Sequence, residues 1–227
     1  MSAQLIVALD VDTAAEGLEL VDRIGDACQW YKVGKQLFTR FGPEVVRQLK
    51  NRGKKVFLDL KYHDIPNTVR EAVRAAADIG ADMTNVHAGG GAAMLAAAAE
   101  GARESHVLLI AVTVLTSMDE TELASIGLAA TPREQVLRLA RLAQRNGVPG
   151  VVCSALEIEP LRQACGPDFA LVVPGIRPAG SATDDQKRIM TPAEASRLGA
   201  NYLVVGRPIL RAPDPAQAAR DLLAELA

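Results

Sequence analysis

The chain has 227 residues, of which 49% are hydrophobic, and its formal net charge is -2 at neutral pH. This length allows a sizeable buried core in one domain or two small ones, and the composition is that of an ordinary soluble protein. Aromatic residues make up only 4% of the chain and there is no basic excess, so little is available to stack on bases or to neutralise phosphates. We therefore expect no nucleic-acid partner.

Targeting signals and cysteine frameworks are not indicated either. Residues 1–4 enter an apolar run without a basic region or a small-residue cleavage site, and no apolar stretch is long enough to span a bilayer. We expect a cytoplasmic protein with no membrane association. The three cysteines, Cys28, Cys153 and Cys165, are odd in number and lack close metal-ligand spacing, so buried thiols are expected rather than disulfides or a zinc site.

Short apolar runs alternate with helix-compatible sequence along the whole chain. The first run spans Gln4 to Asp10, and apolar residues at helical spacing follow from Thr13 to Ile24. Seven further runs are predicted to be strands, namely Tyr31 to Gly34, Val56 to Lys61, Met83 to Ala88, Val107 to Leu115, Gly150 to Ser154, Leu171 to Ile176 and Tyr202 to Gly206. The repeating unit is a strand followed by a helix.

Prolines and glycines mark the ends of the predicted helices. Pro66 suits the first turn of a helix with Val69, Val73 and Ala76 along one face. The prolines at or near other helix starts are Pro43, Pro132, Pro192 and Pro215. The glycines near helix ends, where left-handed backbone is commonly needed, are Gly25, Gly53, Gly80, Gly101, Gly147, Gly166 and Gly199.

Eight such units in a little over 200 residues predict a closed (β/α)8 TIM barrel. The main alternative is an open doubly wound sheet, which usually carries a glycine-rich dinucleotide loop after its first strand. Residues 9–12, Leu-Asp-Val-Asp, contain no such loop. No linker or charge run divides the chain, and the alanine-rich residues 92–99 suit a tightly packed helix, so we predict a single domain over residues 1–227.

Residues 59–68, Asp-Leu-Lys-Tyr-His-Asp-Ile-Pro-Asn-Thr, are the most informative segment. The side-chain period of two places Asp59 and Lys61 on one face at the end of a buried strand, with Asp64 in the following loop. A buried carboxylate is tolerated only when it is paired, and a lysine between two carboxylates keeps its charged form. Such a lysine is a pre-positioned proton donor, although the three residues alone also fit a structural ion pair.

A barrel brings further polar residues to the same rim, because active sites lie at the C-terminal ends of barrel strands. The predicted rim residues are Asp10, Lys32, Asp59, Lys61, Asn85, His87, Thr116 and Ser117. Inward charges from several strands are costly to bury unless they neutralise one another or a polar substrate. A strand-end histidine is more often a packing residue than an acid or ligand, so His87 receives no catalytic role.

The last two units predict a phosphate site, because barrels often bind phosphate through the loops after strands 7 and 8. Residues 174–177, Pro-Gly-Ile-Arg, leave strand 7 and lead into a long polar loop that contains Gln186. Strand 8 ends at Gly206 and Arg207, where glycine permits close backbone approach and arginine offers a fork of donors. In isolation a Gly-Arg-Pro sequence is more often a surface turn, but its place in the eighth unit favours phosphate.

Across essentially its whole length, the chain resembles the orotidine 5'-phosphate decarboxylase family. The stretches that carry the resemblance are residues 7–10, 31–34, 59–68, 113–117, 173–177 and 205–209. Of these, residues 59–68 are highly specific, and the family usually has phenylalanine where this chain has Tyr62. The resemblance implies a cofactor-free decarboxylase that converts orotidine 5'-phosphate to UMP and carbon dioxide in de novo pyrimidine biosynthesis.

The resemblance also implies the roles of individual residues. Lys32, Asp59, Lys61 and Asp64 would form an alternating charge network, with Asp64 and Thr68 contributed across a homodimer interface. Lys61 would be the proton donor to C6 of the pyrimidine. The implied substrate contacts are Asp10 and Lys32 at the ribose, Thr116 or Ser117 at the pyrimidine, and Arg177, Gln186, Gly206 and Arg207 at the phosphate.

Two rival interpretations stay open. One is a magnesium-dependent sugar-phosphate decarboxylase or aldolase of the same superfamily; those relatives carry a glutamate ligand at the position of Lys32, and an ammonium there cannot ligate a cation. The other is a nucleotide-binding barrel that has lost its chemistry, against which the intact Lys61 argues. We predict no metal and no cofactor.

Overall fold

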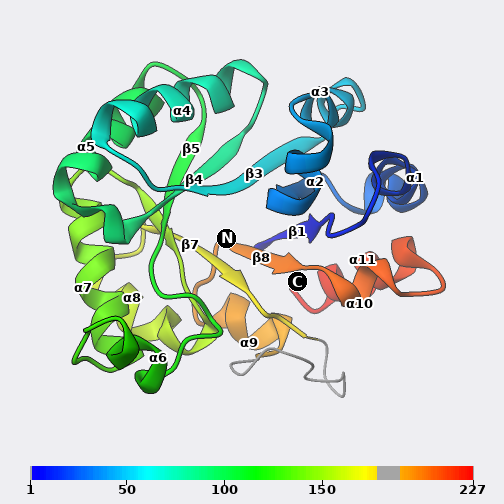
Figure 1. The fold of residues 1–227 in the computed structure, drawn as a ribbon. Helices are drawn as coiled ribbons and strands as arrows, with labels where there is room; N and C mark the ends of the chain where they lie inside the picture. The colour runs from blue at the N-terminus through cyan, green and yellow to red at the C-terminus, as the bar shows by residue number, and fades with distance from the viewer. Residues whose placement is uncertain (1, 178–189, 227) are drawn as a thin grey trace.

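A computed structural model describes residues 2–177 and 190–226 of the chain. Eight parallel strands form a closed barrel in chain order, surrounded by helices (Figure 1). The strands are β1 (Gln4–Ala8), β2 (Trp30–Gly34), β3 (Lys55–Tyr62), β4 (Met83–His87), β5 (Leu108–Val112), β6 (Gly150–Val152), β7 (Ala170–Pro174) and β8 (Tyr202–Val205). β1 pairs with β8, so the sheet has no edges, and the predicted (β/α)8 barrel is confirmed over the open alternative.

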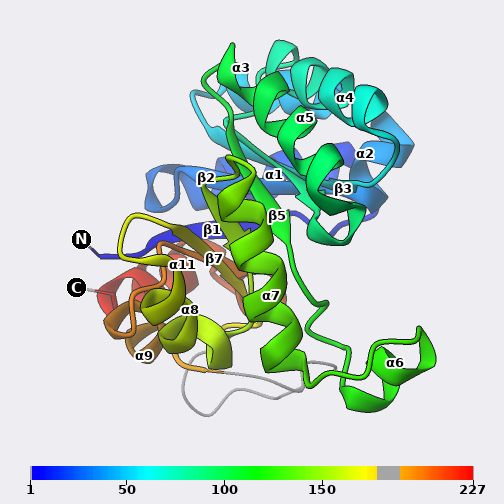
Figure 2. The ribbon, with the colours of Figure 1, turned by 90° about the vertical axis from the view of Figure 1, so that its left-hand side faces the viewer.

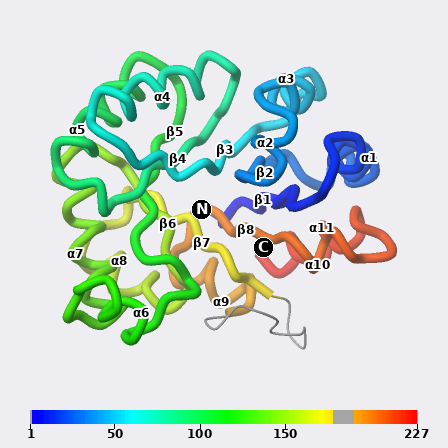
Figure 3. The backbone as a smooth tube through the Cα atoms, viewed as in Figure 1, coloured from blue at the N-terminus to red at the C-terminus, as the bar shows by residue number. Residues whose placement is uncertain are grey.

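Several of the strand-helix units contain more than one helix. They are α1 (Ala14–Ile24), α2 (Lys35–Phe41), α3 (Glu44–Asn51), α4 (Pro66–Asp78), α5 (Gly91–Arg103), α6 (Glu120–Ser125), α7 (Pro132–Arg145), α8 (Ile158–Cys165), α9 (Pro192–Arg197), α10 (Arg207–Leu210) and α11 (Pro215–Ala224). Pairs of helices follow β2, β5 and β8. In Figure 2, α6 projects away from the body of the barrel, between β5 and α7. The chain thus winds once around the barrel and returns β8 to the side of β1 (Figure 3).

The strands separate two apolar layers because successive side chains point to opposite faces. One set of side chains fills the barrel interior and includes Ile6, Trp30, Phe57, Met83 and Ile110. The other set packs outward against the helices in the larger core. The next residues of the same parity on β2, β3 and β4 point into the barrel above the interior layer, and this places Lys32, Asp59 and Asn85 at its C-terminal end.

The helix boundaries follow the predicted proline positions and, with one exception, the glycine positions. Pro66, Pro132, Pro192 and Pro215 each open a helix, and Pro43 caps α3. Six of the seven predicted glycines have positive φ, which confirms their left-handed backbone; they are Gly25, Gly53, Gly80, Gly147, Gly166 and Gly199.

The exception is Gly101, which lies inside α5 and does not have positive φ. A Cβ atom at this position would stand 2.6 Å from the backbone oxygen of Arg70 in α4. The prediction of a left-handed glycine at this position is wrong, because here glycine serves close helix packing instead. Packing between α5 and α4 supports the segment that carries residues 64–68.

Two exclusions made from the sequence concern thiols and membranes. All three cysteines are free; Cys28 and Cys153 are buried, as predicted, whereas Cys165 is only partly buried. Burial raises the pKa of the Cys28 thiol, which suits a packing role. None of the helices within residues 2–177 and 190–226 combines the length and apolar character needed to cross a bilayer.

Replacing Gly101 with alanine tests the helix packing. We expect Gly101→Ala to lower the free energy of unfolding by about 1–3 kcal/mol, because the added methyl group meets backbone that cannot rotate away. Gly17→Ala in α1 is the matched control, since its nearest contact is a Val11 side-chain methyl at 3.3 Å, and it should stay within about 1 kcal/mol of wild type. Urea unfolding measures both. Equal stability of the two variants would contradict the packing role.

Candidate active site

A cavity of about 190 Å³ opens at the C-terminal end of the barrel. Its lining residues come from β2 to β8 and the segment after β5: Lys32, Phe57, Asp59, Lys61, Asn85, Val112, Val114, Leu115, Thr116, Val152, Val172, Pro174 and Val204. Polar side chains enter it from β2, β3 and β4 and from Thr116, whereas β5 to β8 present aliphatic side chains and a proline. The cavity therefore has a charged side and an apolar side.

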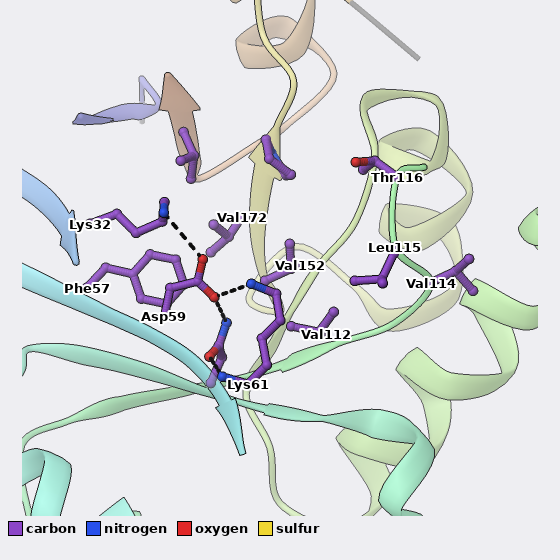
Figure 4. Close-up of a pocket in the computed structure, with 13 residues that line it drawn as sticks. Lys32, Phe57, Asp59, Lys61, Val112, Val114, Leu115, Thr116, Val152 and Val172 are labelled. Atoms are coloured by element: carbon purple, nitrogen blue, oxygen red, sulfur yellow. Dashed lines mark hydrogen bonds and ion pairs between the residues drawn. The ribbon is translucent and has the colours of Figure 1, made fainter. Parts of the chain in front are cut away.

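Asp59 lies between two ammonium groups on the charged side (Figure 4). Lys61 Nζ donates to Asp59 Oδ1 at 2.5 Å, and Lys32 Nζ lies 3.6 Å from Asp59 Oδ2. The Asp59 side chain is only 12% exposed and that of Lys32 only 11%, while Lys61 is 26% exposed. Asp10 also pairs with Lys32, so the two ammonium groups face two carboxylates and the cluster is balanced in charge.

Lys32 is held on the charged side by two carboxylates, and Gly34 leaves room for its ammonium group. Its Nζ donates to Asp10 Oδ1 at 3.0 Å in addition to its contact with Asp59. A Cβ atom on Gly34 would stand 2.9 Å from that nitrogen, so glycine leaves the space that the ammonium group fills. The predicted association of Asp10, Lys32 and Asp59 at one rim is therefore present in the structure.

The backbone around Lys61 departs from the predicted strict alternation. Lys61 has φ of 53°, and it is the one non-glycine residue with positive φ in the described chain. The ladder between β3 and β4 pairs Leu58 with Thr84 and resumes with Tyr62 opposite Val86, so the register shifts in between. Asp59 and Lys61 thus meet through a bulge rather than through a regular pleat.

Electrostatics keep the Asp59 carboxylate ionised. Burial alone raises its pKa, but attraction to Lys32 and then Lys61, together with hydrogen bonds from Lys61 and Asn85, lowers the pKa below its usual value. A carboxylate that is ionised at neutral pH and lies between two ammonium groups orients both of them. The site is thus organised before any ligand binds.

Asn85 is a site residue for which the sequence predicts no role beyond its place at the rim. It is fully buried, donates from Nδ2 to Asp59 Oδ1 at 2.8 Å, and accepts from the Lys61 backbone N–H at 2.8 Å. The available signal was a polar side chain two residues beyond buried Met83, on the inward face of β4. The apolar lining residues were also missed, because their strands contain only apolar side chains and carry no chemical motif.

Asp64 and Thr68 are not brought into the cavity of their own chain. Both are exposed, and they flank Ile65, which is 67% exposed at the start of α4. Asp64 Oδ1 accepts a hydrogen bond from the Ile65 N–H at 2.6 Å, and the described residues place no cation within ion-pair distance of it. The charge network within one chain therefore consists of Lys32, Asp59 and Lys61, with Asp10 beside them.

His87 has the surroundings of a packing residue. Its ring stacks on that of His63, with centroids 5.6 Å apart and planes at 22°. Burial, and then the nearby charges of His63, Lys35 and Lys61, lower the pKa of His87 below its ordinary value. Stacking and the lowered pKa favour the neutral imidazole, and the absence of a catalytic role stays a prediction.

The described residues among those predicted to bind phosphate follow β7 and β8. Arg177 is buried just beyond β7, and Nη1 of its guanidinium donates to the Ile176 carbonyl at 3.1 Å. Gly206 caps α10, which Arg207 opens, and it lies near the end of β1. Thr116 lines the cavity and Ser117 is exposed. Gln186 lies outside the described residues.

A resident metal does not fit the charged side of the cavity. Among residues 2–177 and 190–226, no group of three or more histidine, cysteine, aspartate or glutamate side chains is placed to hold a metal ion. Asp10 and Asp59, the two carboxylates nearest each other there, are joined by the Lys32 ammonium group. An ammonium group repels a cation and has no lone pair to ligate it.

Comparisons with known proteins agree with this geometry. The model of the orotidine 5'-phosphate decarboxylase / HUMPS family matches residues 3–222. An orotidine 5'-phosphate decarboxylase of Vibrio campbellii is 54% identical over 227 residues, covering 99% of this chain and 97% of that protein. The crystal structure of orotidine 5'-phosphate decarboxylase from Lactobacillus acidophilus has a TM-score of 0.89 at 39% identity and covers 99% of both chains. An uncharacterized conserved protein from Geobacillus kaustophilus has a TM-score of 0.86 at 38% identity, covering 98% of this chain and 100% of that one.

The ionised state of Asp59 predicts how stability depends on pH. Asp59→Asn should lower the free energy of unfolding at pH 7 by about 1.5–3 kcal/mol, because two ammonium groups lose their shared partner. Since the folded pKa of Asp59 is lowered, its contribution is present above pH of about 4 and is lost as pH falls through the folded value. The difference in the free energy of unfolding between wild type and Asp59→Asn should therefore become smaller below pH of about 4.

Urea unfolding between pH 7 and pH 3 measures this difference. Asp12→Asn is the matched control, because Asp12 pairs with Arg40 at the surface and its side chain is 74% exposed. Its effect should be small throughout. A difference for Asp59→Asn that stays constant down to pH 3 would contradict the assignment.

Proposed function

Because the chain belongs to the orotidine 5'-phosphate decarboxylase / HUMPS family, we propose that it converts orotidine 5'-phosphate to UMP and carbon dioxide in de novo pyrimidine biosynthesis. Membership confirms the resemblance predicted from the sequence motifs. The observation that carries the proposal is the Lys61 ammonium group, which is bound to buried Asp59 and faces a cavity with an apolar far side. We also propose that the decarboxylase domain extends over residues 1–227 and works in the cytoplasm without a cofactor.

The proposed reaction replaces a carboxylate by a proton at C6 of the pyrimidine. The bond between C6 and the carboxylate carbon breaks, carbon dioxide leaves, and the electron pair remains on C6. The Lys61 ammonium group stabilises this developing charge and then transfers a proton to C6, after which solvent returns a proton to the amine. A cation already held in place needs little reorganisation during the reaction.

Asp59 has a positioning role in this proposal. It accepts from Lys61 Nζ at 2.5 Å and also contacts Lys32, so it fixes the direction from which the proton is delivered. Repulsion between Asp59 and a substrate carboxylate would add ground-state destabilisation. The apolar side, with Val112, Val152 and Val172, offers no hydrogen bonds to a carboxylate and suits neutral carbon dioxide.

The remaining predicted contacts orient the nucleotide. We assign Asp10 and Lys32 to the ribose, Thr116 to the pyrimidine with Ser117 as its alternative, and a phosphate grip to Arg177, Gln186, Gly206 and Arg207. Support for the assignment is the position of Arg177 and Gly206 beyond β7 and β8, across the barrel mouth from Lys61. Binding energy from the phosphate, remote from the breaking bond, can then serve the transition state.

We propose that the active unit is a homodimer in which Asp64 and Thr68 complete the partner's site. In the single chain both residues face outward beside exposed Ile65, an apolar side chain that an interface would bury. Asp64 would then supply the second carboxylate next to the partner's Lys61 and complete the alternating charge network. Each dimer would contain two shared sites.

The first test is turnover of orotidine 5'-phosphate with and without a metal chelator. We expect loss of substrate, measured by its ultraviolet absorbance, at the same rate in both conditions, because Lys32 occupies the place where a metal-dependent relative carries its ligand. Formation of UMP, separated by chromatography, serves as the product control. A requirement for magnesium would replace this proposal by the sugar-phosphate alternative, and absence of turnover would favour a binding protein.

The second test concerns the shared site. Lys61→Ala and Asp64→Ala should each lower kcat by at least about 1000-fold as homodimers, since either change breaks the network in both sites. After subunit exchange, one site of each hybrid dimer contains neither lesion and about a quarter of wild-type activity should return at equal mixing, as random pairing predicts. Native mass spectrometry verifies the exchange. Hybrid dimers without recovered activity would show that Asp64 acts within its own chain.

A further inference from the structure

Asn85 lies where the β3 and β4 ladder is interrupted, and it takes over contacts that a regular ladder would make. Leu58 pairs with Thr84 and Tyr62 pairs with Val86, so three residues of β3 lie opposite the single residue Asn85. The Lys61 N–H, which has no strand partner at this point, donates to Asn85 Oδ1 at 2.8 Å. The side chain of Asn85 therefore fills the gap that the bulge opens.

The same side chain also fixes the carboxylate that orients Lys61. Asn85 Nδ2 donates to Asp59 Oδ1 at 2.8 Å, and this oxygen is the one that accepts from Lys61 Nζ. One amide group thus binds Lys61 through its backbone and, through Asp59, binds the ammonium group at the end of its side chain. Figure 4 shows the contact between Asp59 and Lys61 that Asn85 supports.

The amide of Asn85 satisfies both contacts at once. The Lys61 N–H needs an acceptor and ionised Asp59 needs a donor, and both lie against the same fully buried side chain. An aliphatic residue would leave the N–H without a partner, and a carboxylate would place a second negative charge beside Asp59. Because Lys61 has positive φ, a conformation that costs a non-glycine residue about 1–2 kcal/mol, its geometry depends on such external support.

We propose that Asn85 is a positioning residue of the proposed decarboxylation, which holds the Lys61 backbone in its left-handed conformation and Asp59 in register so that the Lys61 ammonium group points into the cavity. The inference rests on the proposed function for its kinetic consequence. The effect of Asn85 on the position of the Lys61 ammonium group does not depend on the proposed function.

Asn85→Leu removes both contacts and keeps the number and branching of the side-chain heavy atoms. We expect kcat to fall by about 10- to 100-fold while KM stays within about threefold, because proton delivery is misaligned but the nucleotide contacts remain. Thr84→Val is the matched control, since Thr84 is equally buried on β4 and its hydroxyl donates to the Leu58 carbonyl at 3.0 Å, away from the charged residues. It should keep kcat within about twofold, and an equal kcat in the two variants would overturn the proposal.

Asn85→Asp provides a second test that a purely structural role would not affect. When protonated, the introduced carboxyl reproduces the amide, with a hydroxyl donor toward Asp59 and a carbonyl acceptor toward Lys61 N–H. The kcat of wild type divided by the kcat of Asn85→Asp should therefore decrease toward 1 as pH falls, by up to about tenfold per pH unit. The titratable groups nearby are Asp59 and Lys61 on β3, Lys32 on β2 and His87 on β4, while β5 presents uncharged Ile110 in register. A kcat ratio that does not change with pH would overturn the proposal. This test needs only Asn85→Asp, so it decides the proposal even if Asn85→Leu fails to fold.

A crystal structure of Asn85→Leu separates this inference from the proposed function. We expect Lys61 Nζ to leave Asp59 Oδ1 and φ of Lys61 to become negative. Unchanged positions of both would overturn the inference even if wild type decarboxylates orotidine 5'-phosphate. Conversely, if wild type does not decarboxylate orotidine 5'-phosphate, the proposed function is wrong. The position of Lys61 in the Asn85→Leu structure then still tests whether Asn85 holds Lys61.

Discussion

The charged side of the cavity depends on one carboxylate that binds two ammonium groups. Asp59 contacts Lys61 at 2.5 Å and Lys32 at 3.6 Å, and its lowered pKa keeps it ionised. Without this charge, Lys61 would lose the ion-pair partner that holds it and Lys32 would keep only its contact with Asp10. Asp59 therefore makes the proposed chemistry compatible with a folded barrel.

The barrel turns this local interaction into a site with two different sides. Closure of eight parallel strands directs every second residue inward, and above the interior layer these positions carry charge on β2 and β3 and an amide on β4. The corresponding positions on β5 to β8 are apolar. The proposed decarboxylation begins with a substrate carboxylate and releases neutral carbon dioxide. It benefits from this division, because the Lys61 ammonium group lies on one side and the other side solvates a carboxylate poorly.

The sequence alone predicted the barrel and the charged residues because both depend on local patterns. Strand runs and helix-opening prolines such as Pro66 follow the period of the chain, and Asp59 and Lys61 form a motif within three residues. Gly101 was misinterpreted because close approach to Arg70 is a tertiary contact that leaves no local signal. Asn85 was placed at the rim without a role for the same reason, since its two partners lie on the neighbouring strand.

The bulge at Lys61 shows why a strand motif can specify residues without specifying their geometry. In a regular strand, residues two apart are separated by about 6.6 Å and their side chains stand roughly parallel, which favours side-by-side display over convergence. Positive φ at Lys61 turns its backbone N–H toward Asn85 while its ammonium group still reaches Asp59. The conformation is costly for lysine, so buried contacts on β4 must hold it, and Asn85, which makes these contacts, also lines the cavity. The strained backbone of Lys61, the proposed proton donor, therefore depends on the buried amide of the adjacent strand.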